Sequence, residues 1–269
     1  MKPSTASPTL AGALPEVFFS DYGNSRTLHL DSVWVQGSML LDAPYDIELE
    51  YVQRMMAWLL FVEPASARRL HAMQLGLGAG TLTKFCRKKL LMKTTVVELN
   101  PGVIRACRGW FKLPPDDAKL QVLNADAAAA IQNPLWWGTV DALQVDLYDQ
   151  DAAAPVLDSA DFYADCRRLL TPSGCMSVNL FGRASSYEKS LAKINQAFTG
   201  EGACATWVGA FKPTREGNTV VLARNLLPPE KGEPQQPSRA LLAQRAENIH
   251  TRYGLPAPKW LRGLKLPIP

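Results

Sequence analysis

The chain has 269 residues, enough for one large domain or two small ones with a buried core. Its 29 Lys and Arg residues outnumber its 25 Asp and Glu residues, for a formal net charge of +4. No apolar run is long enough to span a membrane, and the N-terminus lacks the apolar core of a signal peptide. Five scattered cysteines without a Cys-x-x-Cys pair indicate a reduced, cytoplasmic protein and argue against a zinc site.

The excess positive charge is confined to the C-terminal segment. Residues 228–269 hold seven basic and three acidic residues, so the rest of the chain is neutral overall. Such a segment could contact nucleic acid or an acidic surface, but a solvated tail is the simpler interpretation. We therefore expect no nucleic-acid partner and no membrane contact.

The first 61 residues predict three successive regions. Residues 1–15 are rich in Pro, Ser, Thr and Ala, which predicts a disordered N-terminus. Residues 16–45 predict a small β region, with two short strands around an Asp-Tyr-Gly-Asn turn and a second turn at Asp31. The apolar spacing of residues 46–61 predicts a long helix packed on a sheet.

A glycine-rich turn follows the next apolar run. Residues 70–75 predict a buried strand, which ends in three alternate glycines, Gly76, Gly78 and Gly80, and a predicted helix at 81–90 comes next. A strand, a glycine turn and a helix N-terminus form a nucleotide-binding layout. Glu98 ends the following strand, where a ribose would need an acceptor. The alternatives are a tight turn in an unrelated α/β protein and a solvated loop acid at Glu98.

Strand and helix patterns alternate through the rest of the domain. Expected strands lie at 70–75, 94–98, 120–123, 140–146, 175–181, 203–208 and 219–223, and expected helices at 81–90, 101–110, 125–131, 159–170 and 187–198. Pro-Ser-Gly at 172–174 predicts a turn. The alternation predicts an α/β fold with a doubly wound, mainly parallel, seven-stranded Rossmann-like sheet whose terminal hairpin adds an antiparallel edge.

The expected domain limits follow from these patterns. The nucleoside-binding catalytic domain is expected to span residues 46–227, and residues 228–269 a Pro-rich linker and a basic tail. Residues 239–253 predict one helix within that tail. Trp260, Leu261, Leu264 and Leu266 are expected to attach the tail to the body or to another subunit.

Polar residues follow several of the expected parallel strands, where ligands collect in open α/β sheets. Asn124 and Asp126 follow one strand, and Asp146, Tyr148 and Asp149 follow the next. Asp146 ends an apolar strand, so desolvation is expected to raise its pKa, and the Asp-x-x-Asp pair is a candidate for proton abstraction or cation binding. Helix capping by Asp126 and loop capping by the pair remain as alternatives.

This order of motifs resembles the spermidine synthase (polyamine aminopropyltransferase) family, which shares the class I S-adenosylmethionine methyltransferase fold. The resemblance rests on the glycine turn, the strand-terminal Glu98, Asn-Ala-Asp at 124–126 and Val-Asp-x-x-Asp at 145–149. It extends to the segment from Leu28 to Gln36 and to Tyr51, Gln53 and Met55 in the next expected helix. It covers roughly residues 26–223.

The resemblance implies a cofactor, substrates and residue roles. The cofactor is decarboxylated S-adenosylmethionine, the acceptor is a diamine such as putrescine, no metal takes part, and the enzyme is a homodimer. Asp146 would help to deprotonate the attacking amine and Asp149 would hold the polyamine. The other implied site residues are Gln36, Gly76, Gly78, Gly80, Glu98, Asn124 and Asp126 for the nucleoside, Tyr148 beside the catalytic acids, and Tyr51 and Gln53 for the polyamine.

One departure from the family pattern concerns the glycine turn. The family carries an aspartate where this chain has Ala79, and that acid contacts the aminopropyl ammonium of the donor. Its loss leaves room for S-adenosylmethionine itself. The sequence therefore supports an aminopropyltransferase-like enzyme, with an S-adenosylmethionine-dependent N-methyltransferase of small molecules and a non-catalytic nucleoside-binding relative as alternatives.

Overall fold

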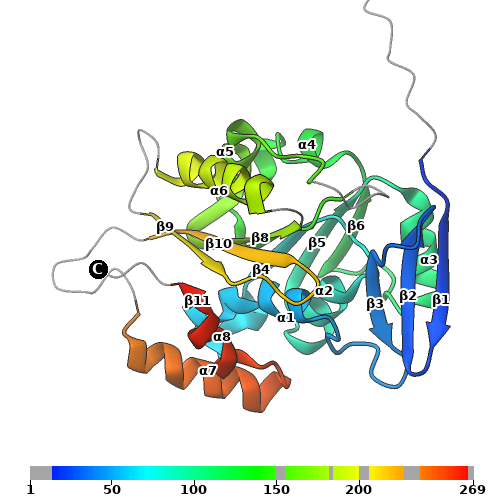
Figure 1. Cartoon of the computed structure of the whole chain (residues 1–269), viewed down its shortest axis with the longest axis horizontal. Coiled ribbons are helices and arrows are strands. Elements are labelled where there is room, and N and C mark those ends of the chain that lie inside the picture. The colour runs from blue at the N-terminus through cyan, green and yellow to red at the C-terminus, as the bar shows by residue number, and fades with distance from the viewer. Residues whose placement is uncertain (1–13, 149–154, 182–183, 200–205, 227–236, 266–269) are drawn as a thin grey trace, which may run out of the picture.

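The computed structural model describes residues 14–148, 155–181, 184–199, 206–226 and 237–265. The described residues form an eight-stranded sheet with helices on both faces and a separate three-stranded sheet (Figure 1). Of the N-terminus predicted to be disordered, residues 1–13 lie outside the described residues. No helix in the described ranges is long and apolar enough to cross a membrane.

The large sheet confirms the predicted fold class. Its strands are β4 (His71–Leu75), β5 (Lys93–Glu98), β6 (Leu120–Asn124), β7 (Val140–Val145), β8 (Leu170–Phe181), β9 (Thr206–Phe211), β10 (Asn218–Asn225) and β11 (Leu264–Lys265). Their order is β11-β9-β10-β8-β7-β4-β5-β6. Strands β6, β5, β4, β7 and β8 run parallel, and β10 pairs antiparallel with β8 and β9. The chain builds outwards from β4 to β6 and then from β7 to β8, so the topological switch point lies between β4 and β7.

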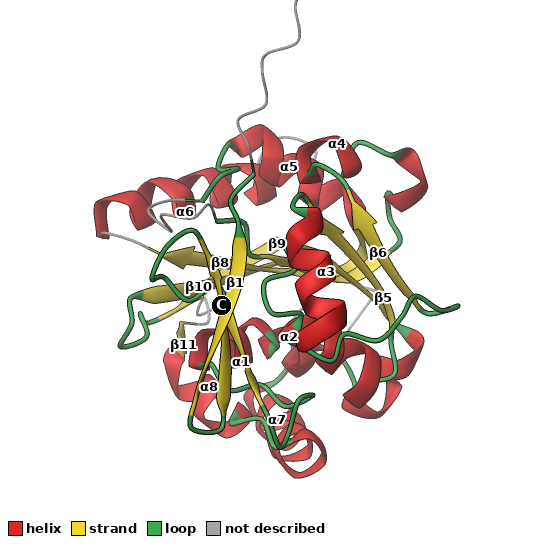
Figure 2. Ribbon diagram, turned by 90° about the vertical axis from the view of Figure 1, so that its right-hand side faces the viewer, coloured by secondary structure: helices red, strands yellow, loops and turns green. Residues whose placement is uncertain are grey.

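Helices cover the large sheet in two layers (Figure 2). Helices α4, α5 and α6 lie on one face and α1, α7 and α8 on the other, which is the doubly wound arrangement (Figures 1 and 2). Each face has its own apolar core, around Phe162 and Phe198 on the first and around Trp58 and Trp260 on the second. The helices are α1 (Glu50–Met55), α2 (Thr81–Lys84), α3 (Pro101–Trp110), α4 (Ala127–Ala130), α5 (Ala160–Leu169), α6 (Ala184–Thr199), α7 (Arg239–Tyr253) and α8 (Ala257–Gly263), with short 3-10 or π turns η1 (Ala57–Phe61), η2 (Pro64–Arg69), η3 (Phe85–Lys89) and η4 (Pro134–Trp136).

Three local predictions were wrong. The long helix expected at 46–61 is only α1, because the chain tightens into the 3-10 turn η1 after Met56, where Ala57 to Leu60 are buried on all sides. The helix expected at 81–90 changes from α2 to the π turn η3 after Lys84. The turn expected at 172–174 is a bulge inside β8, because Val140 pairs with Leu170 and Ala142 with Cys175, which leaves three more residues on β8 than on β7 between these pairs. Gly174 allows this path, since a Cβ there would lie 2.8 Å from the Val140 carbonyl oxygen.

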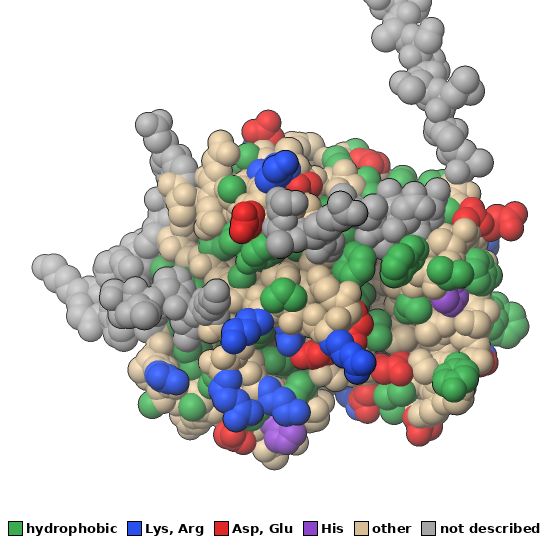
Figure 3. Space-filling model, in the orientation of Figure 1, with side chains coloured by type: hydrophobic (Ala, Val, Ile, Leu, Met, Phe, Trp, Pro, Cys, Tyr) green, Lys and Arg blue, Asp and Glu red, His purple; other side chains and the backbone are tan. Residues whose placement is uncertain are grey.

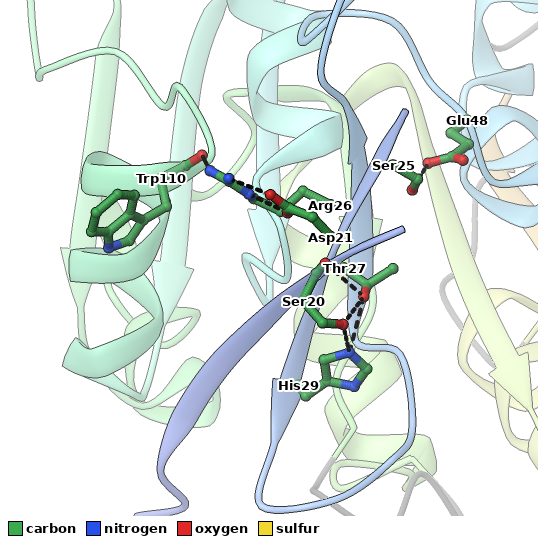
Figure 4. A network of polar contacts seen from close by, with 8 residues as sticks. All are labelled: Ser20, Asp21, Ser25, Arg26, Thr27, His29, Glu48 and Trp110. Atoms are coloured by element: carbon green, nitrogen blue, oxygen red, sulfur yellow. Dashed lines mark hydrogen bonds and ion pairs between the residues drawn. The ribbon is translucent and has the colours of Figure 1, made fainter. Parts of the chain in front are cut away.

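The small sheet consists of β1 (Val17–Tyr22), β2 (Ser25–Leu30) and β3 (Gly37–Leu40), paired antiparallel in that order. The first two are the predicted strands, and β3 was not expected. Figure 4 shows how β2 is attached to the main domain. Arg26 pairs with Asp21 at 2.7 Å and donates to the Trp110 carbonyl oxygen of α3 at 2.9 Å. Ser25 Oγ donates to Glu48 Oε2 at 2.8 Å, which fixes Glu48 beside the sheet.

The C-terminal segment packs on the body of the protein. The predicted helix at 239–253 is confirmed as α7, and α8 and β11 follow it. Trp260 and Leu264 are buried in the core that also contains Trp58, and Leu266 lies outside the described residues. Tyr253 Oη donates to the Pro64 carbonyl oxygen at 3.1 Å. Residues 239–264 therefore cover the sheet face that carries α1.

Candidate active site

A cavity of about 690 Å³ opens beyond the carboxyl ends of the parallel strands, at the switch point between β4 and β7. Residues of β2 and of the β2–β3 connection form its opposite wall. The lining residues that are candidates for a function come from every strand around the switch point. They are Gln36, Glu48, Glu50, Tyr51, Gly76, Gly78, Glu98, Asp126, Asp146, Tyr148, Asn179, Glu216 and Asn218, and they lie among apolar neighbours such as Trp34, Leu99, Leu157 and Phe181.

The glycine turn brings the backbone very close to two other segments. Gly76 has φ +91°, and a Cβ there would lie 2.1 Å from the Asp146 carbonyl oxygen. Gly78 has φ +51°, and its Cβ would lie 2.8 Å from the Gln36 carbonyl oxygen. A side chain is excluded at both positions by conformation and by space. The absence of side chains at these glycines therefore allows the turn to pack against the segment directly after β7 and against the β2–β3 connection at the cavity.

Glu98 is fixed at the end of β5 by backbone donors. Its Oε2 accepts the Leu77 N–H at 2.9 Å and its Oε1 accepts the Asn100 N–H at 2.8 Å. Burial raises the pKa of this carboxyl, and the backbone hydrogen bonds partly oppose that rise. The Leu99 N–H is a third backbone donor to this carboxylate, and of its four lone-pair sites at least one is left for a ligand. Glu98 is thus a pre-oriented acceptor beside the glycine turn, as a ribose would require.

Asp146 occupies the centre of the site, directly after β7. Its Oδ1 accepts a hydrogen bond from Asn179 Nδ2 at 2.9 Å, and its Oδ2 accepts one from Tyr51 Oη at 3.4 Å. Burial raises the pKa of Asp146 to about 6, against the lowering effect of these two donors. The structure thus agrees with the expectation that desolvation raises the pKa of Asp146. A carboxylate with this pKa is ionised at neutral pH and can still accept a proton.

The two tyrosines of the cavity make different contacts. Tyr51 Oη points to Asp146, and burial beside that carboxylate raises the pKa of Tyr51 far above its usual value. Tyr148 Oη donates to the Asn179 carbonyl oxygen at 3.0 Å and accepts the Phe181 N–H at 2.6 Å. The Tyr148 hydroxyl is thus both a donor and an acceptor, and its two hydrogen bonds connect the segment after β7 to β8.

Three predicted site residues that the structure describes do not line the cavity. Gly80 begins α2 with φ +67° and packs on Leu113. Asn124 Nδ2 donates to the carbonyl oxygens of Glu98 and Leu99. Gln53 Nε2 donates to the Ile47 carbonyl oxygen at 2.8 Å. Asp149 lies outside the described residues. The structure thus gives a local structural role to Gly80, Asn124 and Gln53, which contact segments next to residues of the cavity.

The sequence left open whether Asp126 caps a helix or belongs to the binding site, and the structure shows that it caps α4 and lines the cavity. Its Oδ1 accepts the Ala129 N–H at 2.8 Å and so caps α4, yet the residue also lines the cavity. Gln36 lines the opposite wall from the β2–β3 connection.

The residue at the family's aspartate position does not face the cavity. Ala79 is only 2% exposed and packs in the apolar core beneath the small sheet. A Cβ built on Gly37 would lie 2.9 Å from the Ala79 Cβ. The side chain at position 79 therefore points to β3, and other residues must account for the charge in the cavity.

Sequence reasoning missed five polar residues of the site. They are Glu48, Glu50, Asn179, Glu216 and Asn218. Among them, Asn179 could have been recognised from the sequence, because it is an amide inside the apolar strand pattern of residues 175–181. Glu216 lies in the β9–β10 turn and Asn218 begins β10, and only the order of the strands brings both to the cavity.

Negative charge dominates the cavity. Six of the described lining residues are acidic, namely Glu48, Glu50, Glu98, Asp126, Asp146 and Glu216, and none of the described lining residues is Lys, Arg or His. Glu50 is paired with Arg54 at 2.6 Å, which leaves five of the lining acids without an ion pair among the described residues. Figure 3 shows acidic side chains near the middle of this face, and basic side chains mainly over α7 and α8. No group of His, Cys, Asp and Glu suited to a metal occurs among the described residues.

Comparison with known proteins gives close relatives in sequence. A polyamine aminopropyltransferase of Chromobacterium violaceum is 31% identical over 254 residues, which cover 94% of this chain and 90% of the relative. A polyamine aminopropyltransferase of Neisseria meningitidis serogroup A is 32% identical over 256 residues, 95% of this chain and 91% of the relative. No protein-family model matches the sequence.

Solved structures share the fold at lower identity. A probable spermidine synthase from Corynebacterium glutamicum has a TM-score of 0.66 at 18% identity, over 95% of this chain and 93% of that one. Human methyltransferase-like protein 13 in complex with SAH has a TM-score of 0.64 at 20% identity, over 77% and 93% of the two chains. A spermidine synthase in complex with the transition-state analogue AdoDATO has a TM-score of 0.54 at 17% identity, over 89% of each chain. These likenesses confirm the predicted methyltransferase-like fold.

Proposed function

Because this chain belongs to the polyamine aminopropyltransferase family, we propose that it transfers an aminopropyl group from decarboxylated S-adenosylmethionine to a diamine such as putrescine. The observation that carries the proposal is the charge of the cavity. Five lining acids without an ion pair among the described residues favour ligands that bring only positive charge. The proposed donor carries a sulfonium and an ammonium but no carboxylate, and a diamine carries two ammonium groups.

The reaction requires an uncharged amine, whereas a free alkylamine is protonated at neutral pH. In the proposed step the amine nitrogen attacks the aminopropyl carbon bonded to sulfur, and the carbon–sulfur bond breaks. The sulfur keeps the electron pair, so methylthioadenosine leaves. Asp146 takes the proton lost by the amine, and its position beside Tyr51 and Asn179 supports this role.

The remaining assignments complete the proposal. Glu98 accepts hydrogen bonds from the ribose, Gln36, Asp126 and the glycine turn surround the nucleoside, and Asp149 holds the distant ammonium of the acceptor. The geometry of Glu98 and the location of Gln36 and Asp126 support the first two. The homodimer and the cytoplasmic location stay predictions, and light scattering of the purified protein tests the first of them.

An N-methyltransferase that uses S-adenosylmethionine is the second candidate, since Ala79 departs from the family pattern. Its donor carries a carboxylate, which would enter the acidic cavity without a basic partner in the described lining. Because like charges repel in a poorly solvated site, the cavity favours the decarboxylated donor.

Titration calorimetry separates the two candidates. We expect decarboxylated S-adenosylmethionine to bind at least about tenfold more tightly than S-adenosylmethionine, a difference of about 1.4 kcal/mol. Methylthioadenosine, which keeps the nucleoside alone, serves as the reference ligand. Tighter binding of S-adenosylmethionine than of its decarboxylated form contradicts the proposal and favours the methyltransferase.

A further inference from the structure

Two asparagine side chains form a relay that ends on Asp146. Asn179 lies on β8 and is only 4% exposed, and its Nδ2 donates to Asp146 Oδ1 at 2.9 Å. Its Oδ1 accepts a hydrogen bond from Asn218 Nδ2 at 3.1 Å. Asn218 begins β10, the strand paired with β8, so the two side chains are diagonal neighbours on one sheet. The relay thus joins three strands of the sheet at the cavity floor.

The relay allows only one orientation of the Asn179 amide. If that amide flipped, its oxygen would face the Asp146 carboxylate and its NH₂ would face the NH₂ of Asn218. Both contacts would then be lost, because a carboxylate only accepts and an NH₂ only donates. Asn218 is itself held by Thr214, whose N–H donates to the Asn218 carbonyl oxygen at 2.7 Å. The donor aimed at Asp146 is therefore set in advance by the β9–β10 turn.

We propose that Asn179, oriented by Asn218, is a positioning residue that keeps Asp146 ionised and directs its Oδ2 toward the amine acceptor. The proposal rests on the proposed function, because it assigns a proton-accepting role to Asp146. Asn179 occupies Oδ1, which leaves Oδ2 to Tyr51 and to the substrate. It acts through Asp146 and not through the substrate.

The surroundings of Asp146 make this donor necessary. Tyr51 on α1 and Tyr148 in the following segment face it, and both are neutral at the pH of the reaction because burial raises the pKa of each hydroxyl. The other ionisable groups in the described lining are the carboxyls of Glu48, Glu50, Glu98, Asp126 and Glu216. Burial of Asp146 favours its protonated form. The hydrogen bonds from Asn179 and Tyr51 are what oppose this effect.

The test replaces Asn179 with Leu, which keeps the volume and removes the donor. We expect the acidic limb of the pH profile of kcat/KM to move up by about one pH unit or more. Near pH 6.5, kcat should fall about threefold for a shift of one unit, while the KM for the nucleoside donor changes little, and activity should recover at high pH. Asn218→Ala frees the Asn179 amide and should shift the limb in the same direction by a smaller amount.

Ser177→Ala is the matched control, because Ser177 lies two residues earlier on the same strand and is buried without a hydrogen-bond partner for its Oγ in the described part of the chain. Its pH profile should equal that of the wild type. Loss of activity by the same factor at every pH in both Asn variants would overturn the proposal, since it would indicate a purely structural role.

A second readout separates this inference from the proposed function. The pKa of the Asp146 carboxyl, followed by ¹³C NMR without substrate, should rise in Asn218→Ala and in Asn179→Leu. An unchanged Asp146 pKa contradicts the relay even if the enzyme transfers aminopropyl groups. Absence of transfer by the wild type contradicts the proposed function, while the NMR shift still decides the relay.

Discussion

At the scale of single residues, the site depends on a few groups whose surroundings change their chemistry. Asp146 is an acid that burial makes a better proton acceptor, and Glu98 is an acid that backbone donors hold in one orientation. Both were visible in the sequence, because each ends an apolar strand. Asn179 was overlooked, because an amide in a strand shows its importance only when its hydrogen-bond partners, directly after β7 and on β10, are known.

Replacing Asp146 with Asn should separate catalysis from stability. We expect the transfer rate to fall by about 10²- to 10⁴-fold, which is the usual contribution of a general base. The variant should nevertheless unfold at a higher denaturant concentration at pH 7.5. A buried carboxylate with a raised pKa costs on the order of 3 kcal/mol, and Asn removes that charge while it can still bond to Asn179 and Tyr51.

The pH dependence of this stability difference has a definite sign. Folding raises the pKa of Asp146 to about 6, so the folded state binds the proton more tightly than the unfolded state. The stability that Asp146 contributes is therefore lost as the pH rises from about 4 to about 6. The stability of Asp146→Asn relative to the wild type should grow across that window in denaturant unfolding. A constant difference from pH 4 to pH 7.5 contradicts the assignment of a raised pKa.

At the scale of secondary-structure elements, prediction was accurate where the local sequence decides the outcome. Helix α3 begins and ends at the predicted residues because Asn100 caps it and Pro101 suits its first turn. The region at 46–61 was predicted poorly because its apolar residues are buried on all sides, and periodicity then cannot distinguish a regular helix from 3-10 turns. Strand order was also beyond local patterns, and it brings the β9–β10 turn to the cavity.

The glycine turn between β4 and α2 should not tolerate a side chain at Gly76. Gly76→Ala places a methyl group 2.1 Å from the Asp146 carbonyl oxygen at a residue with φ +91°. We expect a loss of about 2–4 kcal/mol in the free energy of unfolding, together with loss of nucleoside binding.

Gly109→Ala provides the control for this change. Gly109 lies within α3, and a Cβ there would meet no atom within 4 Å. Because alanine favours a helix over glycine, this variant should gain up to about 1 kcal/mol. Denaturant unfolding and calorimetry measure both variants. Equal stability of the two variants would mean that the glycine turn does not approach β7 as described.

At the scale of the whole molecule, charge is distributed unevenly. The chain has a formal net charge of +4, yet its cavity is lined by acids, and basic side chains gather over α7 and α8 (Figure 3). The overall charge therefore does not report what the site binds, and composition alone suggested only a neutral body with a basic tail. The fold places the cavity, which is the proposed nucleoside-binding location, at the switch point of the sheet. The acids that line this location determine which ligands fit it.

Analysis of the products tests the proposed aminopropyl transfer most directly. The purified protein is incubated with putrescine and either decarboxylated S-adenosylmethionine or S-adenosylmethionine, and amines and nucleosides are identified by mass spectrometry. We predict an aminopropylated amine and methylthioadenosine in equal amounts from the decarboxylated donor, and no transfer from S-adenosylmethionine. A methylated amine with S-adenosylhomocysteine, formed from S-adenosylmethionine alone, would contradict the proposed function.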